Sequence, residues 1–338
     1  MESNVGILKR APALRGRKDI HIEAVLSVEP GLKEFVANRK VDLLCRKQVN
    51  NMPYINRYFE GVNSSLELNE TIAGYFETFS ARRSRMKINR IPVLREVYFG
   101  YEFLTKRVWP KIKGLNRLYF AISSCENRLL SKAEVMGRLV CCGFEIDEVE
   151  SKNGKTYFLA HKVAEPKFVE NSNYGLFFRL TRVGKGRKLF GVRKMRTMHP
   201  FSEFLHEYMI EKHGFSASGK IQDDFRLTPW GKFLRKYWID ELPQLINVLT
   251  GDMSLVGARP VSESYYKRLP EDLRQLRDQS KPGCIPPYLS LGYEPSLKNV
   301  LKAERIYLEE RKQKGIRTDF KYAFWALYNI VFKRMRSK

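Results

Sequence analysis

Residues 238–249 constrain the fold of this chain more than any other run. In this segment two acidic residues are followed by apolar residues at the spacing of a helix. Apolar side chains recur along it at the spacing i, i+3, i+4 and i+7, as Leu242, Leu245, Ile246 and Leu249. That spacing predicts an amphipathic helix. Gly251 is placed to end the helix, and Pro243 fits only within its first turn. Asp240 and Glu241 therefore lie at or just before the helix N-terminus.

The predicted position gives these two carboxylates a chemical role. Free backbone N–H groups and the helix dipole keep an Asp ionised at a helix N-terminus, and they can also hold a phosphate. Such a place suits a carboxylate nucleophile that attacks a phosphoryl group. The alternative is that Asp240 only caps the helix, and the pair taken alone favours that simpler role.

Four other sequence blocks flank this run. They are Arg-Val-Gly-Lys-Gly at 182–186, Lys-Met-Arg-Thr-Met at 194–198, Asp-Phe-Arg-Leu-Thr-Pro-Trp-Gly-Lys-Phe-Leu-Arg at 224–235 and Gly-Asp-Met-Ser-Leu-Val-Gly-Ala-Arg-Pro at 251–260. In this order they resemble the bacterial sugar transferase family, the monotopic polyprenyl-phosphate phosphoglycosyl transferases. The resemblance covers residues 174–283, about a third of the chain.

The resemblance implies a reaction. A sugar-1-phosphate would pass from a nucleotide sugar, with UDP as the expected nucleotide, to polyprenyl phosphate, releasing UMP and initiating surface polysaccharide or glycoconjugate assembly. It implies that Asp240 is the nucleophile, which forms a covalent aspartyl intermediate that the lipid phosphate then attacks. Glu241 would bind Mg²⁺, a cation that prefers carboxylate and phosphate oxygens.

An alternative from another class is a catalytically silent scaffold, or a nucleotide-sugar-binding partner of a glycan assembly complex. The intact set of Asp240, Glu241, Lys194 and Arg259 favours the enzyme.

Both substrates of such an enzyme are anionic, so the site needs cations. Five basic residues are candidates for phosphate binding: Lys194, Arg196, Arg226, Arg235 and Arg259. Lys194 and Arg196 alternate with neutral residues along a predicted strand, which places both on one face. Arg259 follows a predicted turn, where its guanidinium could bind phosphate through two hydrogen bonds. For any single cation a solvated salt bridge is an equally good interpretation, and only the group favours a phosphate site.

The chain departs from the family pattern in three places. The family normally carries a re-entrant membrane helix before its catalytic core, but the corresponding residues 160–168 are Ala-His-Lys-Val-Ala-Glu-Pro-Lys-Phe and cannot enter a bilayer. The usual Gly-Pro-Arg-Pro is Gly-Ala-Arg-Pro at 257–260, and the usual Pro-Gly-Ile-Thr-Gly is Pro-Gly-Cys-Ile-Pro at 282–286. We therefore expect a divergent branch of the family with altered donor recognition.

The relation to membranes rests on the last part of the chain. No stretch reaches the ~18–20 apolar residues that a spanning helix needs. Residues 322–332 are uncharged and aromatic, and the basic residues Lys333, Arg334, Arg336 and Lys338 follow them. Two alternatives stay open for residues 322–338: an interfacial helix on an anionic membrane, or a helix docked on the core.

Charge and cysteine content narrow the partners and the compartment. The chain has 61 Lys and Arg against 37 acidic residues, a net charge of +24, which implies an anionic partner. It carries no recognisable nucleic-acid-binding motif, so nucleic acid is not the expected partner. Five cysteines without CxxC spacing, and an N-terminus without an apolar signal region, indicate the cytoplasm. We expect peripheral association with the inner face of the cytoplasmic membrane, and a homo-oligomer stays open.

The length of 338 residues gives room for two domains in an α/β fold class, with α+β character in the C-terminal half. We expect an α/β domain over 1–165, a linker at 166–173, and a catalytic domain over 166–338 that ends in an amphipathic helix. A helix from residue 131, a strand over 143–149, a turn at 153–154 and a return strand over 156–160 are similar to the end of a class I methyltransferase. Residues 1–60 lack the glycine-rich cofactor loop, so we expect a degenerate, non-catalytic relative.

Overall fold

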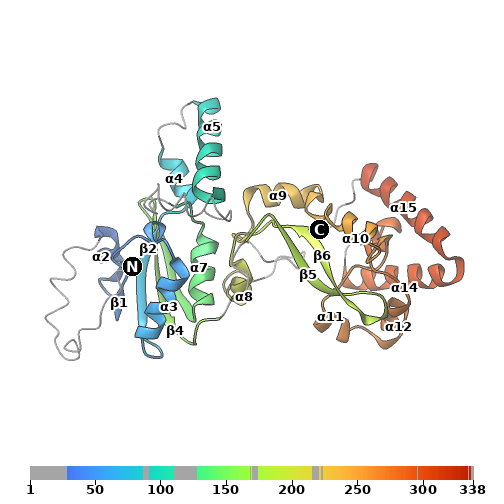
Figure 1. Ribbon diagram of the computed structural model, residues 1–338, viewed down its shortest axis with the longest axis horizontal. Helices are drawn as coiled ribbons and strands as arrows, with labels where there is room; N and C mark the ends of the chain where they lie inside the picture. The colour runs from blue at the N-terminus through green and yellow to red at the C-terminus, as the bar shows by residue number, and fades with distance from the viewer. Residues whose placement is uncertain are drawn as a thin grey trace. The chain divides into compact units, whose positions relative to one another are not determined.

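The computed structural model describes residues 29–86, 91–109, 128–167, 169, 174–214, 221, 224–294, 296–333 and 335. Helices and strands are mixed, which confirms the α/β fold class. The chain divides into two compact units (Figure 1): residues 1–174 with 199–226, and residues 175–198 with 227–338. Residues 199–226 thus belong to the first unit although they lie between two segments of the second unit along the chain, and no sequence signal indicates this. The domain boundary at 165 and 166 stays a prediction, and most of the expected linker and of the basic C-terminal flank lies outside the described residues.

The first unit is built on a four-stranded sheet with the order β1-β2-β4-β3. Its strands are β1 (Leu43–Leu44), β2 (Thr71–Phe76), β3 (Phe144–Lys152) and β4 (Lys155–Lys162). β1 is parallel to β2, whereas β4 is antiparallel to both β2 and β3. The predicted hairpin is confirmed, because β3 and β4 meet at Asn153 and Gly154, which both have positive φ. The methyltransferase resemblance itself stays a prediction.

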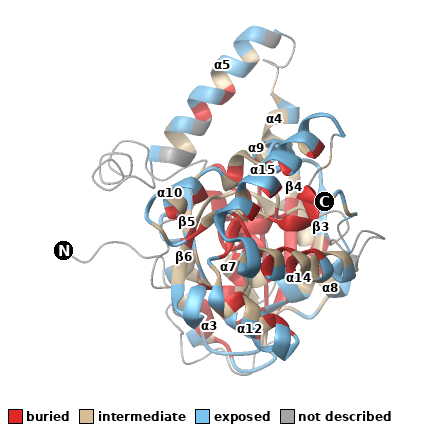
Figure 2. Cartoon of the chain, turned by 90° about the vertical axis from the view of Figure 1, so that its right-hand side faces the viewer, coloured by how far each residue is buried: buried red, intermediate tan, exposed pale blue. Residues whose placement is uncertain are grey.

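Helices surround this sheet. They are α2 (Pro30–Val36), η1 (Val49–Asn51), α3 (Ile55–Ser65), α4 (Phe79–Arg85), α5 (Pro92–Phe103), η3 (Leu104–Val108), α7 (Lys132–Cys141), η6 (Ser202–Leu205) and α8 (His206–His213). α7 begins as predicted, because the Ser131 hydroxyl oxygen accepts a hydrogen bond from the Glu134 N–H at 3.1 Å. The core joins strand and helix residues such as Phe59, Phe76 and Phe158, all fully buried. In Figure 2 α5 is exposed along most of its length, whereas α3 and α14 carry both buried and exposed positions.

The second unit contains two small sheets and several helices. β5 (Phe177–Val183) and β6 (Leu189–Met195) form an antiparallel hairpin, and β7 (Ser254–Val256) pairs with β8 (Gly283–Ile285) in parallel. The helical elements are η5 (Lys185–Arg187), α9 (Pro229–Lys236), η7 (Ile239–Glu241), α10 (Gln244–Leu249), α11 (Glu263–Lys267), α12 (Glu271–Gln279), α13 (Pro287–Ser290), α14 (Leu297–Lys314) and α15 (Ile316–Val331). Their core includes Val256, Leu273, Tyr307 and Tyr322.

The helix predicted at 242–249 is present as α10, but its apolar face is exposed. Leu249 is 86% exposed, whereas Gln244 and Asn247 are buried. The reason is that backbone N–H and carbonyl groups of β6 that face α10 need hydrogen-bond partners, and a polar side chain of α10 supplies them. The Asn247 side chain accepts from Arg193 N–H at 3.0 Å and donates to the Gly191 carbonyl at 2.9 Å. The polar side of α10 therefore faces inward.

Of the two alternatives for the C-terminal segment, α15 shows docking on the core, whereas contact with a membrane stays a prediction. One face docks on the core: Tyr322 is buried, and its ring lies 5.0 Å from that of Tyr307. The other face exposes apolar side chains such as Phe320 and Phe324. Among the described residues, none of the helices has the length and apolar character needed to span a bilayer.

Candidate functional site

Asp240 and Glu241 lie in η7, a single 3-10 turn directly before α10, as predicted. Pro243 is the N-cap of α10. Trp238 precedes the turn with a positive φ of 58°, a left-handed conformation that costs a bulky residue roughly 1–2 kcal/mol. Its side chain packs against the cluster around Tyr288 and Leu289. This packing supports the backbone conformation that begins η7.

Glu241 is held by two cations. Lys194 Nζ lies 2.8 Å from Glu241 Oε1, and an Arg259 Nη atom lies 3.1 Å from the same oxygen. Burial alone raises the pKa of Glu241, but the positive charges of Lys194 and Arg259 outweigh it, so the pKa is lowered from its ordinary value. Glu241 is therefore an ionised, paired carboxylate.

Asp240 differs from its neighbour. It is 8% exposed, and burial together with the negative charge of Glu241 raises its pKa, despite the opposing charges of Lys194 and Arg235. The ionised form that the sequence predicts for a carboxylate at a helix N-terminus is thus opposed here by burial and by Glu241, and the prediction that Asp240 is ionised stays a prediction. Adjacent carboxylates whose pKa values are displaced in opposite directions are suited to different roles.

Arg235 approaches Asp240 because α9 is anchored at Thr197. Thr228 N–H donates to the Thr197 carbonyl at 2.9 Å, and Arg235 Nε donates to Thr197 Oγ1 at 2.9 Å. Gly231 permits this approach, because a Cβ there would overlap the Thr197 carbonyl oxygen. The sequence Thr-Pro-Trp-Gly thus fixes the helix that brings Arg235 to the site.

Two predicted cations have other partners. Arg196 Nε donates to the Gly175 carbonyl at 3.1 Å, and its guanidinium lies 4.8 Å from the centre of the Phe178 ring. Arg226 belongs to the first unit, where it forms two hydrogen bonds of 2.8 Å with Asp224. The structure therefore groups Lys194, Arg235 and Arg259 with the carboxylates, whereas Arg196 bonds elsewhere in the same unit and Arg226 belongs to the other unit.

Sequence reasoning missed two residues of this site. Burial and the positive charge of Arg259 lower the pKa of Arg182, so Arg182 lies within electrostatic range of Arg259. Burial and the charge of Glu241 raise the pKa of Cys284 to about 12, so this thiol lies within electrostatic range of Glu241. Arg182 lies in a block that carries the family resemblance, at 182–186, and Cys284 lies at 282–286, where the chain departs from the family pattern; these were the available signals.

A metal at this site would need ligands from the substrate. Within the part of the chain that the structure describes, no three His, Cys, Asp or Glu side chains gather at one point. Mg²⁺ is commonly bound by one or two carboxylates together with substrate phosphates. The carboxylates of η7 fit that donor set.

Comparison with known proteins agrees with the geometry. Residues 164–333, 170 of the 338 residues, match the family model described as bacterial sugar transferase. The galactosyl transferase CpsE of Streptococcus agalactiae is 39% identical over 107 residues, which cover 31% of this chain and 24% of that protein. An undecaprenyl-phosphate galactose phosphotransferase of Salmonella typhimurium is 40% identical over 107 residues, 30% of this chain and 22% of that protein. A UDP-glucose:undecaprenyl-phosphate glucose-1-phosphate transferase of Caulobacter vibrioides is 43% identical over 110 residues, 31% of this chain and 37% of that protein.

The match spans only 22% to 37% of these relatives' lengths, but the family model covers half of this chain. This chain belongs to the bacterial sugar transferase family.

Proposed function

We propose that this protein transfers a sugar-1-phosphate from a UDP-sugar to a polyprenyl phosphate, with release of UMP. The observation that carries the proposal is the η7 pair, in which Glu241 is held by Lys194 and Arg259 while Asp240 stands beside it. Two relatives are named for undecaprenyl phosphate, and one of these also for UDP-glucose. Their names support the class of acceptor and donor.

The first step is attack by the Asp240 carboxylate on the phosphorus that bears the sugar. A bond forms between the carboxylate oxygen and this phosphorus, the bond to the bridging oxygen breaks, and its electron pair leaves with UMP. Three cations surround the reacting phosphates in this scheme: Lys194, Arg235 and Arg259. They offset the charge that builds up as an anion attacks an anion.

The second step regenerates the enzyme. An oxygen of the lipid phosphate attacks the same phosphorus, the bond to Asp240 breaks, and the carboxylate is released. The product is a lipid diphosphate sugar. Glu241 would hold Mg²⁺ together with the donor phosphates, and the ion would neutralise their charge when bound.

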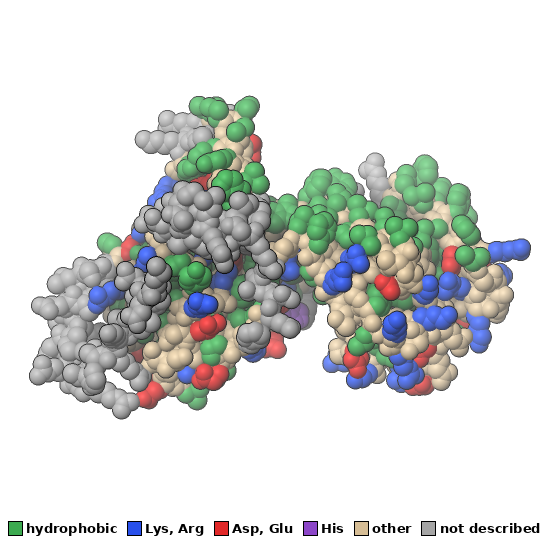
Figure 3. Space-filling view, viewed as in Figure 1, with side chains coloured by type: hydrophobic (Ala, Val, Ile, Leu, Met, Phe, Trp, Pro, Cys, Tyr) green, Lys and Arg blue, Asp and Glu red, His purple; other side chains and the backbone are tan. Residues whose placement is uncertain are grey.

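An exposed apolar surface supports the membrane as the second partner. The apolar surface is defined here by exposed apolar residues of α9, α10 and α15 and of positions next to them: Phe233, Tyr237, Leu242, Leu245, Ile246, Leu249, Phe320, Phe324, Leu327, Val331 and Phe332. In Figure 3 hydrophobic side chains gather along the upper side of this unit, where Figure 1 draws these helices. Water-exposed patches of this kind mark protein or membrane contacts.

The same surface adjoins the carboxylates, because η7 directly precedes α10. A helix pair that lies in the headgroup region would bring Asp240 to the level of a lipid phosphate. With the net charge of +24, this favours peripheral binding to the anionic inner face of the cytoplasmic membrane.

UMP release tests the reaction. A panel of UDP-sugars is incubated with the protein and vesicles that contain undecaprenyl phosphate, and UMP is measured. We expect release with at least one donor, and loss of release when Asp240 is replaced by Asn. Asp272→Asn, a change at an exposed carboxylate of α12 that pairs with Arg305, is the matched control and should keep the activity. No UMP from the wild type with any donor would favour the silent scaffold instead.

A further inference from the structure

The backbone of Arg259 is held by a buried ion pair. Its N–H donates to Glu304 Oε1 at 3.3 Å, and its carbonyl accepts from Arg277 Nη1 at 3.2 Å. Arg277 and Glu304 also bind each other, with Nη2 and Nε at 2.6 and 3.2 Å from Glu304 Oε2. One ion pair therefore forms hydrogen bonds with both the backbone N–H and the backbone carbonyl of Arg259, in the turn at 257–260.

This pair is unusual for its burial. Arg277 is 9% exposed and Glu304 is 1% exposed. Burying two charges is costly, and buried ion pairs can often be replaced by apolar side chains without loss of stability. Stability alone is therefore a weak reason for the pair, and the hydrogen bonds to Arg259 are the additional feature that an apolar replacement would lack.

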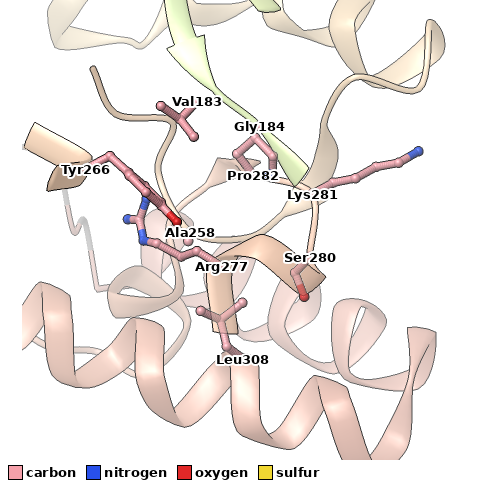
Figure 4. A pocket seen from close by; sticks show the side chains of 9 residues that line it. All are labelled: Val183, Gly184, Ala258, Tyr266, Arg277, Ser280, Lys281, Pro282 and Leu308. Atoms are coloured by element: carbon pink, nitrogen blue, oxygen red, sulfur yellow. The ribbon is translucent and has the colours of Figure 1, made fainter. Parts of the chain in front are cut away.

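The surroundings leave the turn little room to relax. Figure 4 shows Arg277 near Ala258 at a cavity that is also lined by Val183, Gly184 and Leu308. The cavity has only about 10 Å³ of space, less than a ligand needs. On the other side, a Cβ at Gly257 would come within 2.8 Å of the Gly283 nitrogen. The turn is thus packed between β8 and the ion pair.

The side chain of Arg259 leaves this turn toward the carboxylates, with its guanidinium 3.1 Å from Glu241 Oε1. This side chain is partly exposed, so few packing contacts fix its orientation, and the orientation depends on the backbone conformation of Arg259. Ala258 stands where the family usually has Pro, so one source of rigidity is missing. The two hydrogen bonds to the Arg259 peptide groups supply an alternative.

We propose that Arg277 and Glu304 are positioning residues: they fix the Arg259 backbone so that its guanidinium is held at Glu241 and at the reacting phosphate. The inference rests on the proposed phosphoglycosyl transfer for its kinetic consequence. Its structural consequence, a rigid turn at 257–260, does not depend on any reaction.

The test uses a double variant, Arg277→Met with Glu304→Leu, because either single change leaves a buried charge unpaired and could unfold the chain. The control is Arg305→Met with Asp272→Leu, which removes an exposed ion pair between the same two helices, α14 and α12, that makes no hydrogen bond to Arg259. Hydrogen exchange measured by mass spectrometry should be faster at residues 256–260 in the double variant and unchanged there in the control. Unchanged exchange in the double variant overturns the proposal, whatever the activity.

Kinetics then test whether the pair acts through Arg259. We expect kcat/KM for UMP release to fall about tenfold to a hundredfold in the double variant. In an Arg259→Ala background the same double change should cost less than about threefold, because the residue it positions is gone. Equal losses in both backgrounds would mean a general structural role and would refute positioning. A wild type that releases no UMP counts against the proposed function, and the exchange result still decides the rigidity of the turn.

Discussion

Replacement of Asn247 by Leu should destabilise the second unit and loosen the carboxylate site together. The Asn247 side chain joins α10, which follows η7, to β6, which carries Lys194. A leucine side chain has a similar size but forms no hydrogen bonds, so the Arg193 N–H and the Gly191 carbonyl lose their hydrogen-bond partner. A polar group left without its partner costs about 1–3 kcal/mol, so the loss of both bonds should lower the free energy of unfolding by roughly 2–6 kcal/mol.

Urea denaturation followed by tryptophan fluorescence measures this change. Of the four tryptophans, Trp230, Trp238 and Trp325 lie in the second unit, so the signal reports mainly on it. Leu249→Asn on the exposed side of α10 is the control and should shift the unfolding free energy by less than about 0.5 kcal/mol. A change of that small size for Asn247→Leu would refute the account of why α10 turns its polar side inward.

Three further predictions concern pH, metal and membrane. Because a nucleophilic Asp240 must be ionised and its pKa is raised, kcat should fall as the pH decreases through that pKa. At a pH above the raised pKa the ionised carboxylate destabilises the folded state, so Asp240→Asn should be at least as stable as wild type at pH 7. A pH-independent kcat between pH 4 and 8, or a less stable Asn variant, would contradict this. Glu241→Gln should raise the Mg²⁺ concentration that gives half-maximal activity, because an amide is a poorer ligand for a hard cation, and full activity of the wild type in EDTA would rule out this role. Leu245→Glu combined with Phe324→Glu should reduce sedimentation with anionic liposomes at least tenfold, since each apolar side chain contributes about 1.5–3 kcal/mol when buried. Val93→Glu, at an exposed apolar position of the first unit, is the control. Equal sedimentation of the wild type, the double variant and the control would exclude the apolar surface as the binding site.

Local sequence signals predicted the elements that depend on local chemistry. Ser131 as a helix start and Asn153-Gly154 as a hairpin turn both stand where the structure has them, because caps and turns are set by a few adjacent residues. The position of Asp240 and Glu241 directly before α10 follows from Pro243 in the same way.

Other features depend on residues that are distant in sequence. The spacing of the leucines of α10 predicts a helix, but it does not say whether the apolar face meets a core or the surface; that depends on Asn247 and β6, 54 residues apart along the chain. The burial that raises the pKa of Asp240 is likewise a tertiary effect. The pairing of Arg277 with Glu304 spans 27 residues and has no sequence motif.

A covalent intermediate on Asp240 decides between an active transferase and a silent relative. The protein is incubated without lipid acceptor with UDP-sugars that carry ³²P on the phosphorus attached to the sugar, and the label retained on denatured protein is counted and mapped by peptide digestion. The proposal predicts label on the peptide that contains Asp240, its release when undecaprenyl phosphate is added, and none on Asp240→Asn. Wild type that turns over without retaining label, or an Asn variant labelled as strongly as wild type, would contradict the aspartyl intermediate.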